Sequence, residues 1–214
     1  MIELMTAVIL LVLGGMGASP AFHAVEILLS LFFVFIAPIP IWLPIIHHVF
    51  QTSRPASIKW LTYLSLGIFW FVLGVWTFRH QEFLFSWHFD PSIWIQIVGG
   101  ISFGLALLVD WQVMKTLGVK RLMCWVEFKQ EKTTQEFVSE GIYKFARHPR
   151  YVEYMLISLA VGLLTGYLFF FGFFLYLIIS FAIATHFEER ELVHRFGDVY
   201  RDYQKRVPKF FVGI

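Results

Sequence analysis

The sequence predicts an all-α, polytopic integral membrane protein with about six transmembrane helices, and three observations lead to this prediction. First, 58% of the 214 residues are hydrophobic and only 15% are charged, whereas soluble domains are about a quarter charged. Second, four uncharged runs of 18 to 20 residues match the roughly 20 that a helix needs to cross a bilayer. Third, a longer uncharged run over residues 154–185 requires a turn within the membrane.

The first four expected spans are the uncharged runs 4–22, 27–46, 60–78 and 92–109. We expect the first run to be retained as a span, because Glu3 precedes it and no Lys or Arg does. The three prolines of the second run remove backbone donors and predict kinks. In the fourth run, Gly100 and Gly104 are spaced for close helix packing.

The long run 154–185 is expected to form a helical hairpin. A single helix over its 32 residues would be about 48 Å long, too long for a hydrocarbon layer of about 30 Å. A turn near residues 162–166 returns the chain to the side of residues 115–150. Sixteen of the 17 Lys and Arg residues then face one side, with only Arg79 on the other, as the positive-inside tendency favours. Both termini are therefore expected in the cytoplasm.

We predict a single membrane domain with four parts. These are the four N-terminal spans (1–114), a cytoplasmic connector (115–150), the hairpin (151–186) and a cytoplasmic tail (187–214). The tail has helical periodicity, which predicts an amphipathic helix. Without a role in a binding site, this helix would simply lie on the membrane surface. Its expected apolar stripe is Leu192, Phe196, Val199 and Tyr203, and its expected ion pairs are Glu191–Arg195 and Asp202–Arg206.

A first polar cluster lies in the stretch EGIYKFARHPRYVEY. Pro149 is predicted to begin a helix, which places Arg147 and His148 at a helix N-terminus that favours an anion. Such residues can simply anchor a helix to lipid headgroups. Because Tyr143, Arg147, His148 and Tyr151 fall within nine residues, we favour a binding site.

A second polar cluster, His186, Glu188 and Glu189, ends the last span. The hairpin would place it on the same face as the first cluster. We expect Glu188 to turn inward and Glu189 to be a solvated charge. Helix N–H groups opposite a carboxylate would suit a zwitterionic ligand that also carries a cation.

The paired stretches GIYKFARHPRYVEY and EERELVHRFGDVYRDYQKRVP resemble the isoprenylcysteine carboxyl methyltransferase family and its relatives, the phospholipid N-methyltransferases. The resemblance covers residues 136–208. It implies S-adenosylmethionine bound without a Rossmann domain and a lipophilic or small acceptor (carboxylate, thiol, amine or hydroxyl) at the cytoplasmic membrane face, with no metal ion and no nucleic-acid partner. The cofactor contacts that it implies are Phe137, Val138, Tyr143, His148, Pro149, Arg150, Tyr151 and Glu188.

Two positions depart from the family pattern. Ala184 stands where the family usually has an Arg that holds a substrate carboxylate, and Glu153 stands where it usually has a Gly. An ionisable group inside a membrane is a candidate for function. Glu153, His186 and Arg147 are therefore the candidate catalytic residues, with Glu153 or His186 available to remove a proton from a neutral acceptor. The alternative for Glu153 is a structural role, in which it pairs with a nearby Arg or reaches the membrane surface.

Two other functions remain open at this point. An NADPH-dependent, sterol-reductase-like enzyme would share an R-H-P-x-Y-like stretch, and a non-catalytic membrane protein could retain the fold alone. Asp110, near the end of the fourth run, is expected to lie at the membrane interface. A single cysteine, Cys124, excludes an internal disulfide and an all-cysteine metal site.

Overall fold

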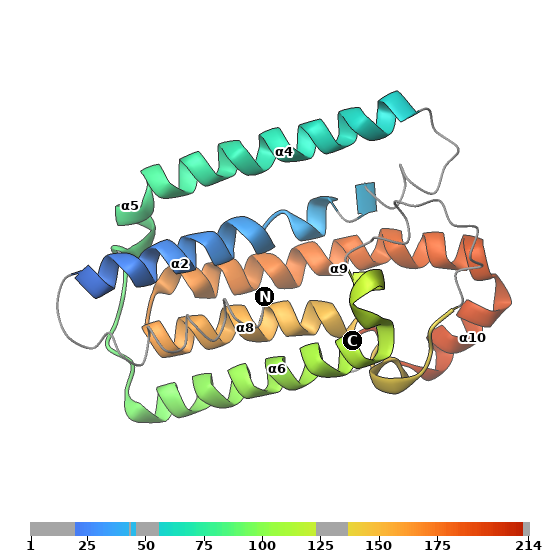
Figure 1. The fold of residues 1–214 in the computed structure, drawn as a ribbon. Coiled ribbons are helices and arrows are strands. Elements are labelled where there is room, and N and C mark those ends of the chain that lie inside the picture. The colour runs from blue at the N-terminus through green and yellow to red at the C-terminus, as the bar shows by residue number, and fades with distance from the viewer. Residues whose placement is uncertain (1–19, 43, 46–55, 123–136, 212–214) are drawn as a thin grey trace.

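The computed structural model describes residues 20–42, 44–45, 56–122 and 137–211 (Figure 1). Seven α-helices and one 3₁₀ helix are the named elements of these ranges, and residues 39–42 and 44–45 are also helical. They are α2 (Pro20–Ile36), α4 (Ala56–Arg79), α5 (Gln81–Phe85), α6 (Ile93–Leu122), η1 (Gly141–Lys144), α8 (Pro149–Thr165), α9 (Leu168–Phe196) and α10 (Asp198–Arg206). The all-α prediction is confirmed, while the predicted span 4–22 falls almost wholly outside the described residues.

Four helices of the described part are long and apolar enough to cross a membrane: Ala24–Trp42, Trp60–Arg79, Ile93–Gly118 and Leu168–Phe196. They correspond to the expected second, third and fourth spans and to the second arm of the hairpin. The first arm, α8, has 17 residues and is about 25 Å long at 1.5 Å per residue. The described residues therefore contain four candidate spans, and six spans remain a prediction.

The long helices lie side by side along a common direction (Figure 1). Helix α8 packs between α6 and α9, α2 lies against α9, and α4 stands at the edge beside α2. The core is rich in aromatic residues of α9, with Phe170, Phe173 and Phe181 each at most 3% exposed. Outward apolar residues on α4, such as Phe71 at 72% exposed, are suited to contact lipid.

The predicted hairpin is confirmed, and its turn lies at Gly166. This residue adopts the left-handed conformation (φ 75°, ψ 2°), which glycine reaches without steric cost. Its N–H donates to the carbonyl of Gly162 at 2.9 Å, and its own carbonyl accepts from the N–H of Phe89 at 3.1 Å. A Cβ on this residue would overlap the carbonyl oxygen of Phe89.

Gly166→Ala is therefore expected to destabilise the protein strongly, by at least about 1–3 kcal/mol for the backbone conformation alone. The overlap with Phe89 adds to this cost. Thermal unfolding in detergent measures the effect. Gly172→Ala is the matched control, because nothing lies within 4 Å of a Cβ added there, and its melting temperature should stay the same or rise. Equal melting temperatures for the two variants would contradict the prediction.

Helix α6 departs from the sequence expectation in two respects. Helix α6 continues past residue 109 to Leu122, with a non-helical Gly118, so the helix is longer than the uncharged run that predicted it. The predicted packing role of Gly100 and Gly104 is wrong, because a Cβ on either would meet nothing within 4 Å. Gly99 is the residue that faces α8, with a Cβ position 3.0 Å from Leu163 Cβ.

The tail is a bent pair of helices instead of the expected single one. Helix α9 runs through both glutamates to Phe196, and the chain bends at Gly197 (φ 58°, ψ −131°) before α10. The bend buries Tyr200 and leaves Val199 62% exposed, so the expected stripe is wrong at Val199.

One of the two expected ion pairs of the tail forms. Glu191 and Arg195 pair at 3.6 Å, as predicted. The carboxylate of Asp202 pairs instead with Lys205 at 2.8 Å. Arg206 contacts only the backbone carbonyl of Asp202, at 3.2 Å.

Candidate functional site

The N-terminus of α8 is tied to the C-terminal tail. The helix begins at Pro149, as predicted, with His148 as the N-cap residue in a non-helical conformation (φ −127°, ψ 61°). The backbone N–H of Arg147 donates to the carbonyl of Pro208 at 2.9 Å, and the N–H of His148 donates to that of Lys209 at 3.0 Å. These two bonds hold the end of the tail beside the first polar cluster.

Glu189 is the common acceptor of the site, and the expectation of a solvated charge was wrong. Its carboxylate accepts from Arg147 Nε at 2.8 Å, contacts His148 Nε2 at 3.1 Å and accepts from Gln204 Nε2 at 3.1 Å. The residue is only 8% exposed, because α9 continues as a helix beneath the folded-back tail. Charge-assisted bonds of this kind are among the strongest in proteins.

The Arg147 side chain donates its hydrogen bonds to Glu189 and to the tail. Besides the bond to Glu189, its Nη1 donates to the carbonyls of Gln204 at 2.9 Å and Val207 at 2.6 Å. The guanidinium joins α8, α9 and α10. We therefore expect Arg147 to position the tail and not to act directly on a substrate.

Glu188, the residue before Glu189 on α9, contacts the beginning of α8. It accepts a hydrogen bond from the Tyr151 hydroxyl at 2.8 Å and lies 3.5 Å from His148 Nδ1. The Tyr151 ring is sandwiched between Phe181, at a centroid distance of 4.3 Å, and His148, at 5.4 Å. The structure thus brings together His148, Tyr151 and Glu188, three of the predicted cofactor contacts.

Phe137 and Tyr143 reach the same region from the segment before α8. Phe137 packs on Tyr203 at 4.9 Å and on Tyr200 at 5.6 Å, while Val138 beside it is half-buried. The Tyr203 hydroxyl donates to the Tyr143 carbonyl at 2.6 Å. Burial raises the pKa of the Tyr203 phenol to about 12 and also raises the pKa of Tyr143, so both phenols are neutral at physiological pH.

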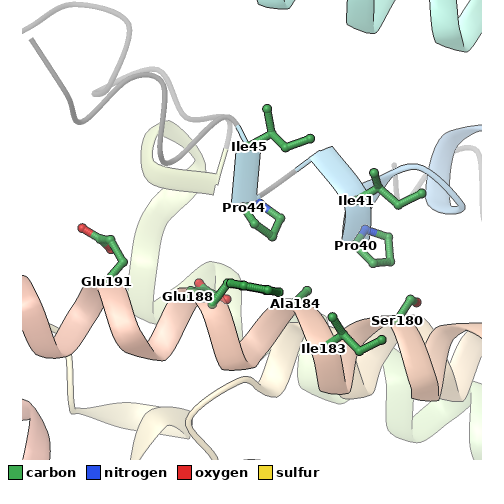
Figure 2. Close-up of a pocket in the computed structure, with 10 residues that line it drawn as sticks. Pro40, Ile41, Pro44, Ile45, Ser180, Ile183, Ala184, Glu188 and Glu191 are labelled. Atoms are coloured by element: carbon green, nitrogen blue, oxygen red, sulfur yellow. The ribbon is translucent and has the colours of Figure 1, made fainter. Parts of the chain in front are cut away.

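An apolar pocket of about 630 Å³ adjoins Glu188 (Figure 2). Its two walls are the proline-rich continuation of α2 and one face of α9. The lining residues are Pro40, Ile41, Pro44, Ile45, Ser180, Ile183, Ala184, Phe187, Glu188 and Glu191. Figure 2 shows the two prolines facing Ala184 and Ile183 across the space. Sequence reasoning missed the first wall, although the prolines predicted the break that forms it.

The predicted kink occurs where α2 ends. The helix stops at Ile36, the chain turns over Ala37 and Pro38, and a short helical segment resumes. The N–H of Trp42 donates to the carbonyl of Pro38 at 3.0 Å. This break turns residues 40–42 and 44–45 toward α9, where four of them line the pocket.

Three of the remaining candidates lie elsewhere. His186 is exposed on α9, where its ring packs edge-on to Phe187 at 5.9 Å. Glu153 is fully buried, and Asp110 is buried between α6 and α8 at 4% exposed, while its expected place at the membrane interface stays a prediction. Arg150 donates through Nε to the Tyr154 hydroxyl at 2.7 Å. No group of three metal-ligating side chains occurs in the described ranges.

Fold and site together define the class of protein: a polytopic helical membrane protein with a polar site where a hairpin and a folded-back tail meet, beside an apolar pocket. Residues 94–199, about half of the chain, match the model of the phospholipid methyltransferase family. The chain belongs to this family, as its motifs indicated. Methyltransferases of the family use S-adenosylmethionine as the methyl donor.

The similar proteins are named either methanethiol S-methyltransferase or protein-S-isoprenylcysteine O-methyltransferase. The chain is 30% identical over 171 residues to methanethiol S-methyltransferase 2 of Bradyrhizobium diazoefficiens, covering 78% of this chain and 51% of that one. It is 25% identical over 172 residues to methanethiol S-methyltransferase of Crocosphaera subtropica, covering 74% and 64%. It is 39% identical over 74 residues to protein-S-isoprenylcysteine O-methyltransferase of Schizosaccharomyces pombe, covering 33% and 30%.

The chain spans about half the length of the curated relatives that it matches. No solved structure matches it.

Proposed function

We propose that this protein binds S-adenosylmethionine at the meeting point of α8, α9 and the tail and transfers its methyl group to a small, apolar thiol. The observation that carries the proposal is the position of Glu188. This carboxylate belongs to the polar cluster and also lines the apolar pocket, so one residue joins a charged donor site to an apolar acceptor site.

The polar cluster suits a cationic donor. When bound, S-adenosylmethionine supplies an electrophilic methyl group on a positively charged sulfur. Glu188 would offset positive charge next to the pocket, and Tyr151 holds the carboxylate in place through its hydroxyl. Phe137, which packs under the tail, would offer an apolar surface to the adenosyl part.

The pocket suits an apolar acceptor better than a carboxylate. Ala184 is 3% exposed and lies in the pocket wall, at the position where the motif of the prenylcysteine enzymes carries an Arg. No cationic side chain lines the pocket within the described ranges. A carboxylate in this pocket would be buried without a cationic partner, which is costly. A short alkanethiol is mostly apolar and needs no such partner. The names of the methanethiol relatives agree with this choice.

The reaction needs alignment and the exclusion of water more than acid–base help. The acceptor sulfur would form a bond to the methyl carbon as the bond from that carbon to the donor sulfur breaks, and the thiol proton would leave to solvent or to a nearby base. The prolines and isoleucines of the pocket would keep water from the reacting atoms. We place the site on the cytoplasmic side. In the expected topology, nearly all Lys and Arg residues lie on the same side of the membrane as the site, and that side is usually the cytoplasmic one.

An acceptor panel tests the proposal. Purified protein in detergent is incubated with S-adenosylmethionine that carries a labelled methyl group and with methanethiol, longer alkanethiols, a prenylcysteine or phosphatidylethanolamine. We expect label in the alkyl methyl sulfides. Label only in the prenylcysteine ester or the phospholipid would contradict the thiol assignment and keep the methyltransferase assignment.

Ala184→Arg is expected to lower kcat/KM for a short alkanethiol by roughly 10-fold or more, about 1.4 kcal/mol in the activation free energy, because a guanidinium would occupy the pocket. A carboxylated thiol such as 3-mercaptopropionate should lose less activity, since the new cation can pair with it. Ala182→Arg, on an exposed face of the same helix, is the control. Equal losses for both thiols would show that the pocket does not select the acceptor.

A further inference from the structure

A second polar group is buried between α6 and α8, away from the pocket. It consists of Asp110 on α6 and of Arg150, Glu153 and Tyr154 on α8. Glu153 is 0% exposed and Asp110 is 4% exposed. Both carboxylate oxygens of Glu153, Oδ1 of Asp110 and Nη1 of Arg150 are buried and have no hydrogen-bond partner among the described residues.

Buried ionisable groups without partners are costly, and more so within a membrane. Packing alone does not require them here, because α6 and α8 also meet through small residues such as Ala106 and Ala160, both 0% exposed. Unsatisfied polar atoms on one face of a helix mark a place where a polar ligand can supply the missing bonds. The buried atoms without a hydrogen-bond partner are carboxylate acceptors of Glu153 and Asp110 and a guanidinium donor of Arg150.

The buried group borders the candidate donor site through Tyr143. The phenol of Tyr143 lies near enough to Arg150, Glu153 and Glu188 to interact electrostatically with all three. Phe137 lies farther out, under the tail. A ligand with an apolar outer part and a charged inner part would fit this order of side chains.

We propose that Asp110, Arg150 and Glu153 bind the zwitterionic amino-acid end of the methyl donor. The carboxylates accept hydrogen bonds from the α-ammonium group, and Nη1 of Arg150 donates to the α-carboxylate. With both carboxyl groups ionised the buried group carries one net negative charge, and the methyl donor carries one net positive charge. This assignment rests on the proposed function, and it gives Glu153 a binding role in place of proton removal.

Calorimetry of the full-length protein in detergent tests the assignment with two nucleosides. S-adenosylhomocysteine has the amino-acid end, and 5′-methylthioadenosine lacks it. Glu153→Gln is expected to weaken binding of S-adenosylhomocysteine about 10-fold to 100-fold, as for the loss of a charge-assisted hydrogen bond. Binding of 5′-methylthioadenosine should change less than about 3-fold. Glu82→Gln, exposed on α5, is the control and should change neither affinity.

Thermal unfolding separates a binding role from a structural one. A neutral amide costs less to bury than an unpaired carboxylate, so the ligand-free Glu153→Gln variant should melt at the same temperature as the wild type or higher. Its stabilisation by S-adenosylhomocysteine should be smaller. A lower melting temperature with an unchanged ratio of the two affinities would overturn the assignment. If Glu153→Gln does not fold, the ratio of the two affinities is measured in Asp110→Asn and Arg150→Gln instead. A ratio equal to that of the wild type in both variants would also overturn the assignment.

The wild-type protein distinguishes failure of this assignment from failure of the proposed function. If it binds both nucleosides equally tightly, the amino-acid end contributes nothing and the assignment is overturned, while donor binding stands. If it binds neither nucleoside, the proposed function fails and the assignment fails with it.

Discussion

Glu189→Ala is expected to release the C-terminal tail and to abolish donor binding. The variant removes the carboxylate that pairs with Arg147 and contacts His148, and it leaves a guanidinium that is only 11% exposed without its charged partner. Removing one member of a buried ion pair typically costs about 3–5 kcal/mol. We expect this cost to appear mainly in the docking of residues 198–211.

Hydrogen exchange of the tail amides measures the effect directly. In the wild type, Gln204 and Val207 are held by Arg147, and their region should exchange slowly. In Glu189→Ala the same amides should exchange much faster. Glu191→Ala, which removes a partly exposed pair with Arg195, is the matched control and should cost less than about 1 kcal/mol. Slow tail exchange in Glu189→Ala would contradict the role given to this residue.

Glu188→Gln is expected to weaken donor binding by roughly 100-fold, which corresponds to about 2.7 kcal/mol, while the tail stays docked. The reason is that the neighbouring residues Glu188 and Glu189 have different contacts. Glu189 holds the tail, whereas Glu188 accepts from Tyr151 and lines the pocket. The amide keeps the size of the side chain and removes the negative charge that would face the donor.

Titration with S-adenosylmethionine, together with hydrogen exchange of the tail, measures both parts of this prediction. Asp202→Asn, which removes an exposed carboxylate paired with Lys205, is the control and should leave donor affinity unchanged. If Glu188→Gln binds the donor as tightly as the wild type, Glu188 serves only as a partner for Tyr151.

The parts of the fold that follow local chemistry were predictable from the sequence. Pro149 begins α8 because proline is suited to the first helical position. The hairpin follows from an uncharged run too long for one span, and it turns at Gly166 because only glycine fits there. The prolines of residues 38–44 break α2, as expected from their missing N–H groups.

The burial of Glu189 could not be predicted, because it depends on a distant contact. Two adjacent glutamates at the end of an apolar run look alike in sequence. Their different environments arise because the chain bends at Gly197 and the tail folds back over one face of α9. The same bend buries Tyr200 instead of Val199, which a single helical period does not anticipate.

The burial of Asp110 has a similar explanation. In sequence it stands five residues before Lys115 and reads as the end of a span. Helix α6 in fact continues to Leu122, so Asp110 lies within the helix and faces α8. The extended helix packs on α8 and η1, and no local sequence pattern encodes these contacts.

Donor binding is most directly tested by titrating the purified full-length protein with S-adenosylhomocysteine and, separately, with NADPH. A single site for S-adenosylhomocysteine, displaced by S-adenosylmethionine and absent for NADPH, is the expected result. Binding of NADPH alone would identify a reductase, and binding of none of these ligands would mean that the cluster around Glu188 is not a donor site.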